Sequence, residues 1–177
     1  LFNELHTYLE AILSNYENGP TQWSGDVTRF YGQFMLVAIV AIFARNGRFS
    51  ELNEFLDTPF ILDNYEKITA KPIRYTRFNQ YLRSLEARNS RLQLRRLSLH
   101  SDLIKHVCEI SDINFRDFMQ ADLILLIRNM MNDVGDSWWP DSLLYAADKD
   151  GSFPWFLRAA AGKAFLPFLS VIGVTSK

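Results

Sequence analysis

The chain has 177 residues, of which 48% are hydrophobic and 22% are charged, and its formal net charge is −1. These values exclude a disordered chain, and a chain of this length buries about 70% of its unfolded surface in one core. We therefore expect a single domain over residues 1–177. The lone cysteine, Cys108, excludes an internal disulfide bond and is typical of the reducing cytoplasm, so we predict a cytoplasmic location.

The sequence begins at Leu1 and enters a helical pattern at once, without a basic and apolar leader. We therefore expect a module excised from a longer, multidomain protein, whose other domains would be partners of this one. Apolar residues three and four apart predict a first amphipathic helix from Phe2 to Leu13.

The longest apolar run of the chain, Phe34 to Ala44, predicts a central helix over residues 27–45. This helix would be buried on nearly all sides, with Asp26 as its N-cap. The run is well short of the roughly 20 apolar residues that span a bilayer, so we expect no membrane segment.

The middle of the chain is less regular. Residues 50–56 predict a short helix that ends before Pro59, and residues 60–77 fit an extended piece or a loop equally well. From Arg77 to Ile110 there is no Gly or Pro, and apolar residues recur at helical intervals. This pattern predicts one long helix, or two helices joined near Asn89.

A further helix is predicted from Phe115 to about Asn132, with Asp112 or Asn114 as its cap. We also expect a short element from Trp138 to Tyr145 and two short helices after it, the second with Pro167 near its first turn. The predicted fold class is therefore all-α: an irregular bundle of about six to eight helices around the buried helix 27–45, with little or no sheet.

Positive charge is concentrated in one part of the sequence. Between Lys67 and Lys105 there are ten Lys or Arg against two acids, whereas the rest of the chain has a charge of −9. Aromatic residues lie among the arginines, which is the combination that contacts nucleic acid. The predicted contact residues for nucleic acid or an acidic protein are Arg74, Arg77, Arg83, Arg88, Arg91, Arg95 and Arg96. Alternatively, these arginines form a solvated helix face that is neutralised by acids of the same chain.

Arg95 precedes His100 with four residues between them. An imidazole transfers protons near neutral pH, and a guanidinium binds phosphate, so this pair has the groups for RNA cleavage without a metal. The spacing resembles the Arg-x4-His motif of the HEPN family of helical ribonucleases. That resemblance implies catalysis by Arg95 and His100 in a homodimer. Alternatively, Arg96 and His100 lie one helical turn apart and flank a buried seam.

Metal ligands and cofactor motifs are sparse. The three histidines, His6, His100 and His106, have no metal-binding spacing, and there is no Gly-rich phosphate loop. We predict neither a metal nor a cofactor. Asp122 and Arg128 flank an apolar run, so one of them is expected to be buried, with an arginine of the basic segment as the partner of the carboxylate.

Together, these patterns favour a non-catalytic helical binding module of a larger intracellular protein. Its basic face would contact nucleic acid or an acidic partner, away from membranes. The alternatives are a metal-independent endoribonuclease and a purely structural or oligomerisation domain.

Overall fold

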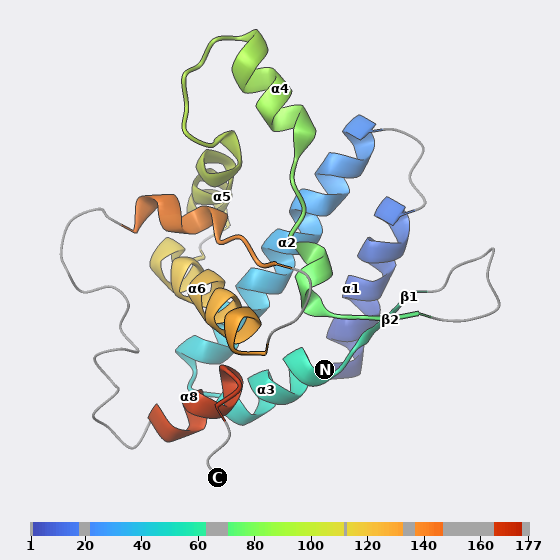
Figure 1. The fold of residues 1–177 in the computed structure, drawn as a ribbon, viewed down its shortest axis with the longest axis vertical. Helices are drawn as coiled ribbons and strands as arrows, with labels where there is room; N and C mark the ends of the chain where they lie inside the picture. The colour runs from blue at the N-terminus through green and yellow to red at the C-terminus, as the bar shows by residue number, and fades with distance from the viewer. Residues whose placement is uncertain are drawn as a thin grey trace.

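The computed structural model describes residues 2–17, 22–62, 71–111, 113–132, 137–146 and 165–174. Within these ranges the chain forms seven α-helices, two 3-10 helices and one two-stranded sheet (Figure 1). The elements are α1 (Phe2–Glu17), α2 (Gln22–Arg45), α3 (Phe49–Asp57), β1 (Phe60–Leu62), β2 (Lys71–Ile73), η1 (Tyr75–Phe78), α4 (Arg83–Arg91), α5 (Leu99–Ile110), α6 (Phe115–Met131), η2 (Asp141–Tyr145) and α8 (Phe165–Val171). The predicted all-α class is confirmed.

α2 runs through the middle of the molecule and packs against α1, α3 and α6 (Figure 1). Apolar side chains cover nearly the whole circumference of this helix, so its neighbours pack on most of its sides. Leu36, Val37 and Val40 are almost completely buried there. In the described part of the chain, residues 25–45 are the one stretch with the length and apolar character to cross a membrane, and 61% of its apolar window is buried inside the fold. A core helix has the same properties.

The prediction that Asp26 caps the central helix is wrong. α2 begins at Gln22, so Asp26 lies within its first turns. The carboxylate of Asp26 binds a different helix, α4, as described below.

The sheet is a short antiparallel pair in which Phe60 lies opposite Ile73. Phe60 is fully buried and stacks on the imidazole of His6, with a distance of 4.5 Å between ring centroids. A ring nitrogen of His6, Nε2, lies 3.2 Å from the carbonyl oxygen of Phe55. Burial lowers the pKa of His6. His6 is therefore a core residue that joins α1 to α3 and to the sheet.

For residues 77–110 the alternative of two helices joined near Asn89 is closer to the structure than one long helix, because α4 ends at Arg91 and α5 begins at Leu99, while η1 covers residues up to Phe78. Between α4 and α5, Gln93 and Arg95 have positive φ angles of 49° and 53°. α5 begins after Ser98, whose hydroxyl oxygen accepts a hydrogen bond from the N–H of Ser101. A serine cap and a left-handed backbone therefore break the helix without any Gly or Pro.

The last third of the chain follows the sequence pattern more closely. Asn114 caps α6, because its side-chain oxygen accepts the N–H groups of Arg116 and Asp117. Pro167 lies in the first turn of α8, as predicted. The helix predicted around residues 153–157 falls outside the described residues.

Candidate functional site

We define the α4 arm as residues 83–98, which comprise α4 and the segment that leads to α5. The arm lies at one end of the molecule, far from α3 and α8 (Figure 1). No residue of α4 is buried. α4 therefore contributes almost nothing to the core, and core packing does not constrain its sequence.

The first end of the arm is attached to α2 by Asp26. The carboxylate of Asp26, only 3% exposed, accepts the backbone N–H of Ser84 at 2.7 Å and a guanidinium N–H of Arg29 at 2.9 Å. Burial would raise the pKa of Asp26, but the hydrogen bonds from Ser84 and Arg29 outweigh it and lower the pKa. Asp26 therefore stays ionised and caps the N-terminus of α4.

The second end of the arm is closed by side chain to backbone contacts. The amide of Asn89 donates to the carbonyl of Arg96 at 2.9 Å, and its oxygen accepts the N–H of Arg96 at 3.3 Å. The Arg96 guanidinium binds Asp102 through two hydrogen bonds of 2.6 and 2.8 Å, and Tyr145 donates to the same carboxylate. The contact with Arg96 lowers the pKa of Asp102. These bonds fix residues 92–98 on α5.

All seven predicted contact arginines are exposed, but their contacts with the rest of the protein differ. Arg96 is neutralised by Asp102. Arg77 lies in η1, outside the arm, and Arg74 lies just before η1 and lines a separate pocket. The remaining arginines of the arm form no ion pair with any residue in the described part of the chain; they are Arg83, Arg88, Arg91 and Arg95. Their charges are therefore available to a partner.

The α4 arm also exposes apolar side chains. Leu92, Leu94 and Leu97 are 47%, 41% and 92% exposed, and Tyr81, just before the arm, is 68% exposed. A group of leucines in water beside unpaired arginines is typical of a surface that contacts another molecule.

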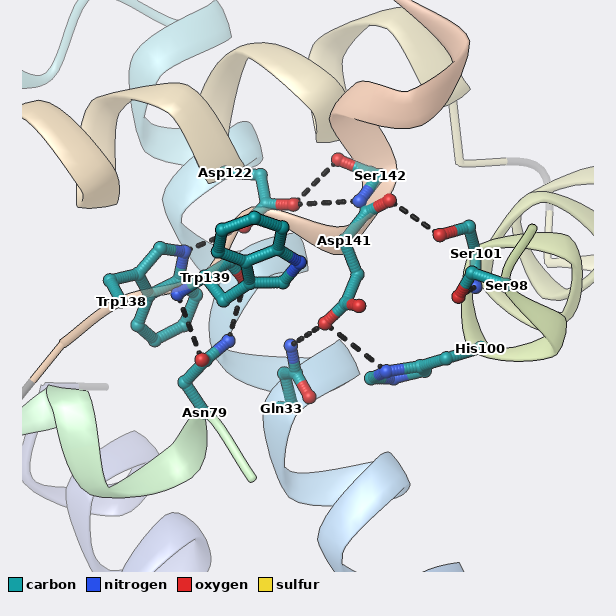
Figure 2. A network of polar contacts seen from close by, with 10 residues as sticks. All are labelled: Gln33, Asn79, Ser98, His100, Ser101, Asp122, Trp138, Trp139, Asp141 and Ser142. Carbon is teal, nitrogen blue, oxygen red and sulfur yellow. Dashed lines mark hydrogen bonds and ion pairs between the residues drawn. The ribbon is translucent and has the colours of Figure 1, made fainter. Parts of the chain in front are cut away.

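Below the arm, a polar network holds the segment 137–146 against α2, α5 and α6 (Figure 2). At its centre is Asp122, a residue of α6 that is 1% exposed. Its carboxylate accepts the indole N–H of Trp138 at 2.7 Å and the N–H and hydroxyl of Ser142 at 3.0 and 2.6 Å. Burial raises the pKa of Asp122 to about 6, although these three hydrogen bonds favour the ionised form. The predicted arginine partner is wrong: the partners are an indole and a serine.

The second carboxylate of the network, Asp141, binds His100. Nδ1 of His100 lies 3.1 Å from Oδ2 of Asp141, and the amide of Gln33 donates to the same oxygen at 3.4 Å. The imidazole is 8% exposed and packs edge-on against Phe30. Nε2 of His100 is buried and has no hydrogen-bond partner among the described residues. A general base must reach the proton that it removes, and this imidazole is covered.

Arg95 and His100 are not brought together by any contact in the part of the chain that the structure describes. Arg95 lies in the exposed segment before α5 with a left-handed backbone, and His100 is in the first turn of α5, facing α2 and η2. Arg96 precedes the helix, so the alternative of a shared helical face with His100 does not apply either.

The same network connects the arm to the core. The hydroxyl of Ser101 donates to the carbonyl of Asp141 at 2.5 Å, and Asn79 exchanges two hydrogen bonds with the backbone of Trp139. Trp138 is buried, whereas Trp139 is 68% exposed. The start of α5, where the arm ends, is thereby fastened to η2.

No group of three or more His, Cys, Asp or Glu able to hold a metal ion occurs among the described residues. Comparisons of the chain with protein-family models, with curated proteins and with solved structures found no match.

Proposed function

We propose that this chain is a non-catalytic helical binding module of a larger protein, and that its α4 arm contacts the anionic surface of an acidic protein or of nucleic acid. The observation that carries the proposal is the state of Arg88, Arg91 and Arg95: all are exposed, and none is paired with a carboxylate of the described residues. Unpaired surface cations are attracted to an anionic partner and accelerate its association.

The attachment of the arm at both of its ends supports this proposal. Asp26 holds one end of α4, and Asn89 and Arg96 hold the other. The guanidinium groups are therefore presented on a fixed backbone, so binding does not require the segment to be ordered first.

The exposed leucines favour an acidic protein as the partner over nucleic acid. Leu97 is 92% exposed, and Leu92 is nearly half exposed. These side chains would gain free energy when apolar groups of a protein surface cover them, whereas phosphates offer them nothing. The expected partner therefore combines carboxylates with apolar side chains.

The test is a set of titrations monitored by fluorescence anisotropy. The labelled probes are an acidic peptide rich in Glu and Leu, the same peptide with Ser in place of Leu, and single- and double-stranded RNA and DNA. Each is titrated at about 50 and about 200 mM salt, because binding through charge weakens as salt increases. We expect the Leu-containing peptide to bind most tightly, with affinity that falls as salt increases.

A matched pair of variants localises the effect. The arm variant is Arg88→Gln, Arg91→Gln and Arg95→Gln, and the body variant is Arg45→Gln, Arg48→Gln and Arg116→Gln. Both remove three positive charges, but Arg45 is paired with Asp117 and Arg48 with Glu51, whereas the arm arginines have no carboxylate partner among the described residues. The proposal requires the arm variant to bind at least about tenfold more weakly than the body variant. Absence of binding to every probe at low salt contradicts it, and tighter binding to RNA or DNA than to the peptides identifies the partner as nucleic acid.

A further inference from the structure

A polar pocket of about 420 Å³ lies at the other end of the molecule, between the end of α3, η1 and the end of α6. None of its lining residues belongs to the α4 arm. The lining combines two arginines with hydroxyl and amide groups: Leu56, Asp57, Thr58, Pro59, Arg74, Tyr75, Arg128 and Asn132. The volume is in the range of cavities that hold small molecules.

Arg128 forms the inner wall of this pocket. It is 2% exposed, although it carries a full positive charge. Its guanidinium donates to the side-chain oxygen of Asn53 at 2.8 Å, to the carbonyl of Val171 and to the carboxylate of Asp57. A buried guanidinium needs an anion beside it, because its desolvation is expensive.

The anion beside Arg128 is largely exposed to water: the side chain of Asp57 is 64% exposed, whereas that of Arg128 is 3% exposed. The carboxylate of Asp57 is held by Arg128 and by the amide of Asn53, which donates to its second oxygen at 2.9 Å. Asp57 lies at the end of α3, so rotation about its side-chain bonds breaks both contacts and turns the carboxylate into water. Another oxyanion could then take its place on Arg128 without any movement of the backbone.

Arg74 provides a second cation at the mouth of the pocket. It is exposed and forms no ion pair with a residue that the structure describes. Burial raises the pKa of Tyr75 to about 12, and the charges of Arg128 and Arg74 both act against this rise. Arg128 and Arg74 line the same pocket as Tyr75. The Tyr75 hydroxyl donates only a long hydrogen bond, 3.5 Å, to the carbonyl of Leu125.

We propose that this pocket binds the phosphate group of a small phosphorylated molecule, with Arg128 and Arg74 as its two cationic ligands and Asp57 as a carboxylate that the phosphate displaces. Two guanidinium groups match the double charge of a phosphate monoester, and arginine binds phosphate oxygens in pairs. The Tyr75 hydroxyl and the Asn132 amide are further donors in the lining. The volume beyond the phosphate accommodates the organic part of the ligand.

The test measures binding of methyl phosphate by isothermal titration calorimetry, in a buffer free of phosphate and at constant ionic strength. Sulfate and acetate serve as comparison anions, because acetate separates a phosphate site from a site for any carboxylate. We expect saturable binding of methyl phosphate and much weaker binding of acetate. Absence of saturable binding, or equal affinity for acetate, overturns the proposal.

Three variants assign the binding to the pocket. Arg74→Gln should weaken binding at least about tenfold, because a charge-assisted contact is lost. Asp57→Asn should strengthen it, because the competing negative charge is removed while the side-chain shape is kept. Arg45→Gln, the same charge change outside the pocket, should bind like the wild type. Affinity that is unchanged in Arg74→Gln contradicts the assignment, as does weaker binding by a folded Asp57→Asn.

A second readout covers the case in which Asp57→Asn folds poorly. Without the carboxylate, the charge of Arg128 is left with neutral partners only, so the variant should unfold at a lower temperature than the wild type. Methyl phosphate should then raise the unfolding temperature of this variant more than that of the wild type. A smaller increase in unfolding temperature for the variant than for the wild type would contradict the proposal that phosphate displaces the Asp57 carboxylate. None of these outcomes depends on the α4 arm.

Discussion

In the α4 arm, the guanidinium groups of Arg88 and Arg91 are exposed and have no carboxylate partner among the described residues, whereas in the network around η2 both oxygens of Asp122 accept hydrogen bonds. Ionisable side chains thus occur in opposite surroundings in one small fold. Charge at the surface contributes little to stability, while a buried carboxylate is costly unless it is fully satisfied. The arm should therefore tolerate substitutions that the network cannot.

The largest effect is expected at the centre of the network. Asp122→Ala removes the acceptor of the Trp138 indole and of both donors of Ser142. Leaving these buried donors unsatisfied should lower the free energy of unfolding by about 3 kcal/mol or more. Chemical denaturation followed by tryptophan fluorescence measures this change. A loss below about 1 kcal/mol would mean that the network does not hold segment 137–146 in place.

The second effect is a pH dependence of the same residue. Burial raises the pKa of Asp122 to about 6 in the folded chain, above the ordinary value of 3.8 for a carboxyl group in water. The folded state therefore holds the proton more tightly, and this contribution to stability is fully present below pH 3.8 and is lost as the pH rises through about 6. Its full size is about 3 kcal/mol. Carboxyl carbon NMR should show Asp122 titrating near pH 6; a midpoint near pH 4 contradicts this account.

A smaller effect is expected where the arm joins the core. Asp26→Ala removes the cap of α4, which should lower stability by about 1–2 kcal/mol. Because Asp26 has a lowered pKa, its contribution is present above the unfolded pKa and is lost as the pH falls through the folded pKa. Hydrogen exchange should accelerate at the amides of α4 more than at those of α6. Equal acceleration throughout the chain would show that α4 is part of the global folding unit.

The smallest effect on stability is expected on the arm itself. The triple substitution of Arg88, Arg91 and Arg95 by Gln should change the free energy of unfolding by less than about 0.5 kcal/mol, because these side chains are exposed and unpaired. Denaturation curves of the variant and the wild type provide the comparison. A large loss would show that the arginines stabilise the fold, and the contrast between arm and network would then be wrong.

The sequence predicted the parts of this fold that depend on local pattern. The apolar run at residues 34–44 predicted a buried helix, and Asn114 was a recognisable cap because its side chain acts within its own helix. Asp26 was misassigned because its partner, Ser84, is 58 residues away in the sequence. Periodicity cannot show such long-range contacts.

The interruption between α4 and α5 was predicted only as one of two alternatives, two helices joined near Asn89, because Asn89 and Arg96 close it through contacts between a side chain and the backbone. All seven predicted contact arginines are exposed, and their role as contact residues stays a prediction. The sequence did not show that these arginines have different surroundings: Asp102 neutralises Arg96, and Arg74 lines a pocket with Arg128. For His100, nothing local in the sequence indicated Asp141 as its partner.

The most direct test of the central claim compares the two charge-matched triple variants in binding to the Leu-containing acidic peptide at low salt. If the α4 arm is the contact surface, the arm variant loses at least about tenfold in affinity while the body variant stays close to the wild type. If both variants lose affinity equally, the peptide responds only to the net charge of the chain, and the arm is not a binding site.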